Sequence, residues 1–265
     1  MPTITSPSNP KIKQLRALRQ RKQRDATGLF LVEGIYHVGE AVAAGAGVEY
    51  ICYAPDLLSS SFARELVAQQ TALGVPCYAT TPQIFASLAE KENPQGILAV
   101  VRKRQLTLER LTPESFPWGV ALVAPQDPGN VGAILRSIDA VGASGLLLLD
   151  SSVDPYHPGA VRASMGALFW FPVVAAPFAD FAQWARRRGY HIYGASAHGS
   201  ADYRSMTHYQ FPGILLLGSE REGLSAEQAA VCDHLIRLPM KGRVSSLNLA
   251  VAAGILLYAM AESVG

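Results

Sequence analysis

The sequence VALVAPQDPGNVGAILRS, residues 120–137, predicts a strand, a stiff loop and a helix in direct succession. Val120–Val123 is an apolar run typical of a strand in a sheet that is covered on both faces. Two prolines and a glycine stiffen the loop that follows it. Val131–Val141 then places its apolar residues at helical spacing. Repetition of such units builds an α/β domain with a parallel sheet.

The alternation of strands and helices continues toward the C-terminus. Further strands are predicted at Leu146–Leu149, Val173–Val174, His191–Tyr193, Ile214–Leu217 and Leu235–Leu238. Further helices are predicted at Gly159–Leu168, Phe181–Arg188, Ala226–Cys232 and Ser246–Glu262. We therefore expect residues 118–265 to form one α/β domain.

The N-terminal part predicts a smaller α/β unit over residues 1–105. Its strands are expected at Leu29–Glu33, Tyr50–Tyr53, Val75–Tyr78 and Ile97–Val101. Its central helices are expected at Tyr36–Ala44, Ser61–Leu73 and Pro82–Ala89. Residues 106–117 combine charges, threonines and two prolines, so we expect them to form a linker.

A basic helix is predicted over residues 9–27. Asn9 is suited to cap its N-terminus and Pro10 to occupy its first position, while Ile12 and Leu15 fall on one face. Between residues 11 and 24 the segment carries cations and no acid: Lys11, Lys13, Arg16, Arg19, Arg21, Lys22 and Arg24. Such a density of positive charge attracts phosphates. A solvated helix face without a partner is the alternative.

The composition is that of a globular protein. Of 265 residues, 49% are hydrophobic and 17% are charged, which excludes a largely disordered chain. The N-terminus lacks the pattern of a signal peptide, and the longest apolar run, Leu249–Met260, is too short to span a membrane. We expect a cytoplasmic protein without a membrane segment. The cysteines and histidines show no metal-ligand spacing, so no metal site is expected.

Polar segments follow three of the predicted strands, at the position where open α/β sheets bind ligands. In residues 125–137, Asn130 begins a helix, and Arg136 lies within an otherwise apolar helical pattern. An arginine in such a helix calls for an anionic partner. A position on the solvent face of the helix is the alternative.

The other two segments are LLLGSEREGLS, residues 215–225, and LPMKGRVSSLNLAVA, residues 238–252. In the first, Gly218 allows a ligand to approach the backbone beside the acidic Glu220, although a tight turn with solvated charges is the alternative. In the second, Ser246 and Asn248 stand at the start of an Ala-rich helix. Helix capping explains one of these two residues but not the whole loop.

Several common motifs are absent. The sequence has no GxGxxG, GxxxxGK[ST], HExxH or GxSxG. A typical dinucleotide site, a phosphate-binding loop, a zinc protease and an α/β-hydrolase are therefore not supported.

Together, PQDPGNVGAILRS, LLLGSEREGLS and LPMKGRVSSLNLAVAAGILLY resemble the motifs of the SpoU (TrmH-type) branch of the SPOUT RNA methyltransferases. They occur in the family's order between Val120 and the C-terminus, and AVRASMGA at residues 160–167 is similar to a lesser family element. The first hundred residues resemble, through SNPKIKQLRALRQRK and GLFLVEG, the substrate-binding domain of ribosomal-RNA members, which is similar to ribosomal protein L30e.

The resemblance implies an L30e-like domain followed by a SPOUT domain with a deep C-terminal trefoil knot. It also implies a homodimer formed through the C-terminal domain, the cofactor S-adenosyl-L-methionine and an RNA partner. The implied catalytic residues are Arg136, Asn130, Glu220, Ser246 and Asn248. The implied cofactor-binding residues are Leu217, Gly218, Ile236, Leu238, Met240, Ser246 and Leu247. RNA contacts are expected from Lys11, Lys13, Arg16, Arg19, Arg21, Lys22 and Arg162.

The chain departs from the family at Arg221-Glu222, where many members carry smaller residues, and this puts the conformation of that loop in question.

The resemblance further implies methyl transfer to a ribose 2′-hydroxyl in structured RNA, and the accessory domain favours 23S ribosomal RNA. Arginine stays protonated in proteins, so we expect Arg136 to bind the target nucleotide's phosphate while that phosphate or a water accepts the proton. The alternatives are a transfer-RNA 2′-O-methyltransferase, a non-catalytic RNA-binding or ribosome-assembly protein, and a small-molecule transferase. The last lacks support because there is no glycine-rich nucleotide loop.

Overall fold

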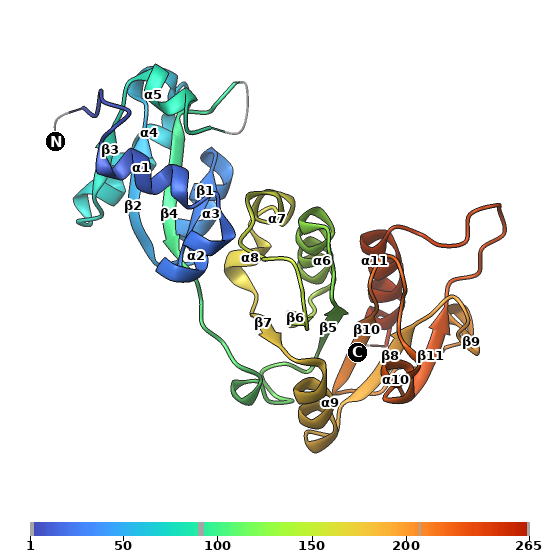
Figure 1. The fold of residues 1–265 in the computed structure, drawn as a ribbon. Coiled ribbons are helices and arrows are strands. Elements are labelled where there is room, and N and C mark those ends of the chain that lie inside the picture. The colour runs from blue at the N-terminus through green and yellow to red at the C-terminus, as the bar shows by residue number, and fades with distance from the viewer. Residues whose placement is uncertain (1–2, 90–92, 207, 264–265) are drawn as a thin grey trace. The chain divides into compact units, whose positions relative to one another are not determined.

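A seven-stranded parallel sheet organises the second half of the chain in the computed structural model, which describes residues 3–89, 93–206 and 208–263. The strand order is β7-β6-β5-β10-β8-β11-β9, and every neighbouring pair runs parallel (Figure 1). The strands are β5 (Trp118–Val123), β6 (Leu146–Leu149), β7 (Val173–Ala176), β8 (His191–Ala195), β9 (Ala201–Asp202), β10 (Gly213–Leu217) and β11 (His234–Arg237). The predicted α/β class with a parallel sheet is confirmed.

The order in which the chain adds its strands reverses at the centre of this sheet, although all the strands run parallel. From β5 the chain proceeds to β6 and β7 on one side, whereas from β10 it proceeds to β11 on the other side. Leu122 of β5 pairs with Leu217 of β10. The loops that follow these two strands therefore begin side by side at one edge of the sheet and lead away in opposite directions. Such a switch point is where parallel sheets form ligand-binding crevices.

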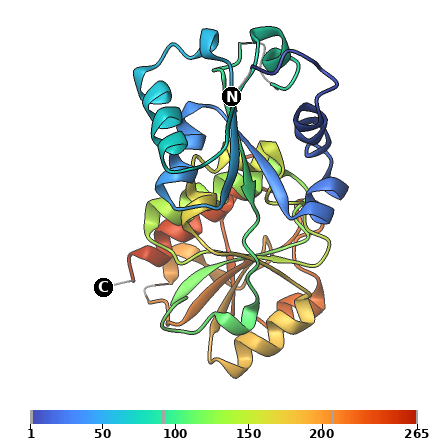
Figure 2. The ribbon, with the colours of Figure 1, turned by 90° about the vertical axis from the view of Figure 1, so that its left-hand side faces the viewer.

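Helices cover both faces of the sheet. Helix α9 (Phe178–Arg187) lies on the opposite face from α6 (Pro128–Val141) and α11 (Leu249–Ala261) (Figure 1, Figure 2). Alternate strand residues face α9, among them Ala121, Leu147 and Leu216, and they pack with Phe181 and Trp184. The remaining elements of this unit are η2 (Leu108–Arg110), η3 (Tyr203–Ser205) and α10 (Ala226–Ala230). The crossing of the C-terminal segment that would tie a trefoil knot stays a prediction.

The N-terminal part forms a separate four-stranded sheet with the order β1-β4-β2-β3. Its strands are β1 (Leu29–Glu33), β2 (Val48–Tyr53), β3 (Cys77–Ala79) and β4 (Ile97–Arg102), of which only β2 and β3 pair in parallel. Its helices are α1 (Pro10–Ala17), α2 (Arg21–Thr27), α3 (Ile35–Ala43), η1 (Pro55–Leu57), α4 (Ser61–Ala72) and α5 (Pro82–Ala86).

The two units divide between Arg104 and Gln105, but the first unit also includes Tyr156–Trp170. That segment contains α7 (Pro158–Ala163) and α8 (Ala167–Trp170). It packs on β1 because the Phe30 ring contacts both Tyr156 and Phe169, with ring centroids 4.6 and 6.4 Å apart. The expected domains, 1–105 and 118–265, do not include this excursion. Residues 106–117, the expected linker, bury Leu108, Leu111 and Phe116 in the core of the second unit.

Several predicted helices differ from the structure in extent, among them the following three. The basic helix over 9–27 is two helices, because Gln20 is extended and starts α2 anew. Residues 159–168 form α7 and α8, separated where Met165 and Gly166 adopt φ of 50° and 96°. The last helix begins at Leu249 instead of Ser246, because Asn248 is its cap. The two-residue strand β9 was not predicted.

Candidate active site

The loop after β5 is held by its own residues. Asp127 caps α6 by accepting a hydrogen bond from the backbone N–H of Gly129 at 2.7 Å, and Pro128 occupies the first helical position. Ala124 adopts φ of 48°, a backbone conformation that side chains disfavour. The side-chain amide of Gln126 donates a hydrogen bond to the Ala124 carbonyl at 2.8 Å. These contacts bury Asn130 in the first turn of α6, with only 7% of its surface exposed.

The loop after β10 is a tight turn. Ser219 and Gly223 form an isolated antiparallel bridge, and the Gly223 N–H donates to the Ser219 carbonyl at 3.0 Å. Gly223 has φ of 68°, and a Cβ on Gly218 would lie 2.0 Å from the backbone of Gly223. The backbone therefore defines this turn, and the exposed Arg221 and Glu222 side chains do not disturb it. Glycine is needed at both of its ends.

A chain of hydrogen bonds joins three loops that are far apart in the sequence. Asn248 donates from Nδ2 to Oδ1 of Asn130 at 2.9 Å. Asn130 donates from Nδ2 to Glu220 Oε1 at 3.2 Å. Glu220 also accepts from the backbone N–H groups of Gln126 at 3.2 Å and Asp127 at 3.4 Å. The structure thus brings together three of the five residues expected to be catalytic.

Glu220 is held as a carboxylate. Partial burial by itself raises its pKa, but hydrogen bonds from its own backbone, Asn130, Gln126 and Asp127 outweigh that effect and leave the pKa below the ordinary value. All these partners donate protons, which favours the charged form. The network therefore places a fixed negative charge at the switch point.

A cleft of about 660 Å³ opens beside this network at the ends of β8, β10 and β11. That volume lies within the range of roughly 300–1,000 Å³ typical of small-molecule sites. Glu220 and Asn248 line it. Every residue expected to bind the cofactor also lines it: Leu217, Gly218, Ile236, Leu238, Met240, Ser246 and Leu247.

The lining suits a molecule that has both apolar and polar parts. Leu217, Ile236 and Leu238 offer apolar surface, while the Ser246 hydroxyl and the backbone at Gly218 offer hydrogen-bonding groups. S-adenosylmethionine combines an apolar adenine face with polar ribose and amino-acid groups, so these residues fit it. Within the described residues, no three histidine, cysteine or acidic side chains group as metal ligands.

One wall of the cleft was missed by the sequence prediction. Residues 195–198 line the cleft directly after β8. The Gly199 N–H donates to the Ser196 carbonyl at 3.0 Å, and Arg237 donates to the Gly199 carbonyl at 3.2 Å, which fixes a tight turn against β11. The only available signal was position, because the turn follows a strand that was predicted. No residue type in it suggested a site.

Two residues expected to be catalytic stand outside the hydrogen-bond chain. Arg136 is exposed on α6, and its side chain makes no hydrogen bond or ion pair within the described part of the chain. Ser246 is exposed in the loop that precedes α11, where it lines the cleft without capping the helix.

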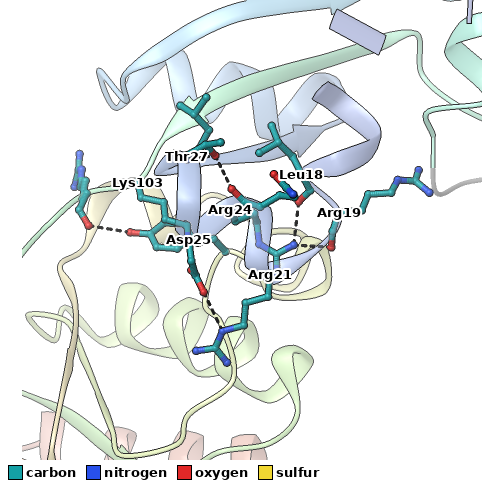
Figure 3. Close-up of polar contacts among 11 residues, drawn as sticks. Leu18, Arg19, Arg21, Arg24, Asp25, Thr27 and Lys103 are labelled. Carbon is teal, nitrogen blue, oxygen red and sulfur yellow. Dashed lines mark hydrogen bonds and ion pairs between the residues drawn. The ribbon is translucent and has the colours of Figure 1, made fainter. Parts of the chain in front are cut away.

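The basic segment lies in the first unit and bends between α1 and α2. The buried Arg24 donates to the carbonyls of Leu18 and Arg19, the two residues at the bend (Figure 3). Asp25, on the same short helix, pairs with Lys103 at 2.7 Å. Arg162, the remaining residue expected to contact RNA, is exposed on α7 of the same unit. None of the described helices is long and apolar enough to cross a bilayer.

Comparisons with known proteins match both units. Residues 117–258 match the SpoU rRNA Methylase family, and residues 9–99 match the MRM3-like substrate binding domain. The chain is 36% identical over 263 residues to the 23S rRNA (uridine(2479)-2′-O)-methyltransferase of Streptomyces viridochromogenes, covering 96% of this chain and 90% of that protein. It is 30% identical to the 23S rRNA (guanosine(2553)-2′-O)-methyltransferase RlmP of Bacillus subtilis, covering 97% and 98%.

The fold also matches a solved structure. The AdoMet-bound rRNA methyltransferase from Sinorhizobium meliloti superposes with a TM-score of 0.88 at 35% identity, covering 97% of this chain and 96% of that one.

Proposed function

Because this chain belongs to the SpoU rRNA methylase family, we propose that its cleft binds the methyl donor and that the Glu220–Asn130–Asn248 chain shapes the active site. The protein is an S-adenosylmethionine-dependent RNA 2′-O-ribose methyltransferase of EC class 2.1.1 that acts on ribosomal RNA. The hydrogen bonds that join three distant loops, two of which line the cleft, are the observation that supports the residue assignments.

Leu217, Ile236, Leu238 and Leu247 would hold the apolar parts of the cofactor, and the backbone around Gly218 and Met240 its polar edges. When bound, the cofactor supplies a methyl group already activated on a sulfonium. Apolar walls exclude water from that side of the cleft, and the hydrogen-bonded turns after β8 and β10 fix two of its walls before the cofactor arrives. Such preorganisation lowers the entropic cost of aligning a hydroxyl for transfer.

The protein must still promote loss of a proton from a weakly acidic ribose hydroxyl. Arg136 cannot accept it, because a guanidinium stays protonated in proteins. Its exposed guanidinium is available for a bidentate pair with the phosphate of the target nucleotide. That phosphate or a water would accept the proton, and Arg136 would stabilise the developing charge. Ser246 and Asn248 orient the ribose from the loop that precedes α11.

The first unit delivers the RNA. The cations of residues 11–24, together with Arg162 on α7, supply attraction to RNA phosphates. Both relatives named above methylate 23S rRNA, and one matches along 97% of this chain, including the substrate-binding domain. This supports 23S rRNA as the substrate, which in turn supports a cytoplasmic location.

A homodimer through the second unit is the assembly we propose. Helix α11 exposes apolar side chains at helical spacing, namely Val251, Ile255 and Tyr258, which are 50%, 36% and 60% exposed. It packs against α6, the helix that carries Arg136. A second copy seated on this face would cover the apolar stripe. Light scattering should give twice the chain mass, and Tyr258→Arg should halve it.

Calorimetry and methylation mapping test the function together. The protein should bind S-adenosylmethionine without RNA, because the cleft is formed by this chain's own loops. Mapping 2′-O-methylated positions in 23S rRNA, with and without the protein, should reveal one protein-dependent site. A protein that binds RNA yet shows no heat with the methyl donor would be a docking protein, and the assignment would then fail.

A further inference from the structure

The cations of the basic segment differ in what holds them. The ammonium of Lys11 lies 4.4 Å from the centroid of the Tyr50 ring and 5.5 Å from that of Tyr78. Those two rings pack edge to face with centroids 5.5 Å apart. Lys11 is half-buried, and cation–π attraction directs its charge toward the sheet of the first unit.

Two arginines join α1 to neighbouring backbone. Arg16 donates to the Pro7 carbonyl at 3.3 Å and to the Ser87 hydroxyl at 2.8 Å. Arg19 donates to the Leu88 carbonyl. Ser87 is the C-cap of α5 and Leu88 follows it, so Arg16 contacts a side-chain hydroxyl and Arg19 a backbone carbonyl just past the end of that helix. These guanidiniums therefore attach α1 to the end of α5.

Arg24 holds the bend itself. Its side chain is 1% exposed and donates from Nη1 to the Leu18 carbonyl at 3.0 Å and to the Arg19 carbonyl at 2.7 Å. Leu18 and Arg19 lie between α1 and α2, so the arginine satisfies carbonyls that the break leaves outside either helix (Figure 3). A buried guanidinium cannot also reach a phosphate on the surface.

The remaining cations are exposed, as Arg16 and Arg19 also are. Lys13 and Lys22 are exposed, and neither side chain has a hydrogen bond or ion pair within the ranges that the structure describes. Arg21 pairs with Asp25 at 3.6 Å, but the two side chains are 60% and 56% exposed. Surface pairs of this kind contribute little and exchange readily for another anion.

We propose that residues 11–24 contact the rRNA backbone through Lys13, Arg21 and Lys22, and that the other four cations position these three. Lys11, Arg16 and Arg19 hold α1 against the rest of the first unit, and Arg24 holds the bend. This inference rests on the proposed role of the segment in RNA binding. It divides the dense run of positive charge into contact residues and positioning residues. Only contact residues neutralise phosphates and release the counterions that make affinity depend on salt.

Lys11 and Lys13 provide a matched test. Lys11→Gln and Lys13→Gln remove the same charge from the same helix, two residues apart, so their long-range electrostatic effects are alike. Affinity for a 23S rRNA transcript should be measured at several KCl concentrations. Lys13→Gln should make the slope of log K against log [KCl] less negative by about 0.7–0.9, the value for one lost phosphate contact. Arg21→Gln and Lys22→Gln should do the same.

Lys11→Gln should leave the slope unchanged and lower the thermal unfolding midpoint, whereas Lys13→Gln should leave the midpoint unchanged. Thermal unfolding confirms that each variant is folded at the assay temperature. Equal slope changes for Lys11→Gln and Lys13→Gln would overturn the division, while the segment's role in RNA binding would stand. Unchanged affinity in every variant would overturn both. Binding of S-adenosylmethionine, a property of the second unit, should be the same throughout.

Discussion

Asn248 donates from its side-chain amide to the Oδ1 of Asn130 at 2.9 Å, across 118 residues of sequence. The Oδ1 of Asn248 accepts from the N–H groups of Ala250 and Val251, so its nitrogen must be the atom that faces Asn130. Asn130 then presents its own nitrogen to Glu220. The cap of α11 therefore fixes which atom donates at each step of this series of hydrogen bonds, and the series ends on the Glu220 carboxylate.

The Asn248→Asp variant tests the role of Asn248 in the hydrogen-bond network independently of its role as the cap of α11. An aspartate still accepts from the first turn of α11, but it sets an oxygen against the Oδ1 of Asn130 and loses the donor. The stability of the fold should change little, while kcat/KM for methyl transfer should fall by about 10²-fold, the order expected from a small misplacement of reacting groups. Steady-state kinetics beside chemical unfolding measures both. If Asn248→Asp kept the natural kcat/KM, Asn248 would contribute only as the cap of α11.

Glu220 makes the stability of the fold depend on pH in the acidic range. Its pKa in the folded chain is below the ordinary value of 4.5, so folding is stabilised by the carboxylate above that value. The stabilisation is lost as the pH falls from there through the lowered pKa, because the unfolded chain binds the proton first. Unfolding curves between pH 7 and pH 3 should show a smaller loss of stability for Glu220→Gln than for the natural protein.

Glu222→Gln is the matched control, since it removes a charge from the same turn without touching the loop after β5. A Glu222→Gln profile as flat as that of Glu220→Gln would assign the effect to the turn's net charge instead of to the hydrogen bonds.

The sequence was informative where the pattern was local. Apolar runs such as Ile214–Leu217 identified the strands, and the segments with Glu220 and Asn248 follow two of them, at the edge where parallel sheets bind ligands. The break in the basic segment was not predictable from periodicity, because it depends on one buried guanidinium reaching back to carbonyls five and six residues earlier. The turn after β8 was missed for a related reason, since it is held by a backbone hydrogen bond and by a guanidinium that comes from β11, Arg237.

Arg24→Lys tests the bend. Both bonds come from Nη1, and the lysine nitrogen is one bond closer to Cα than Nη1, so at least one of the Leu18 and Arg19 carbonyls should lose its partner. The free energy of unfolding should fall by about 1–3 kcal/mol, the cost of an unsatisfied buried group. Arg21→Lys, on the exposed side of α2, should change it by less than about 0.5 kcal/mol. Equal stability of the two variants in a urea titration would contradict a structural role for Arg24.

Arg136→Lys asks whether the fork of the guanidinium or only its charge is needed. If Arg136 grips a phosphate bidentately, lysine should lower kcat/KM by about 10²-fold, as expected when an aligned donor is lost from a transition state. Affinity for S-adenosylmethionine should stay the same, because Arg136 does not line the cleft. Near-normal turnover by the lysine variant would show that a point charge suffices.

Gly199→Ala probes the cleft wall that no motif revealed. A Cβ at this position would lie 2.7 Å from the backbone carbon of Ile236 and from the Leu235 carbonyl, so the turn at residues 196–199 would have to move off β11. Overpacking of this kind costs about 1–3 kcal/mol, and a cost of that size in the cofactor-bound form weakens binding by roughly 5- to 140-fold. Gly242→Ala is the control, because a Cβ there meets nothing within 4 Å. Calorimetry with S-adenosylmethionine should show weaker binding for Gly199→Ala and none of that loss for Gly242→Ala. Equal affinities would remove residues 196–198 from the cofactor site and leave β10, β11 and the loop before α11 to hold it.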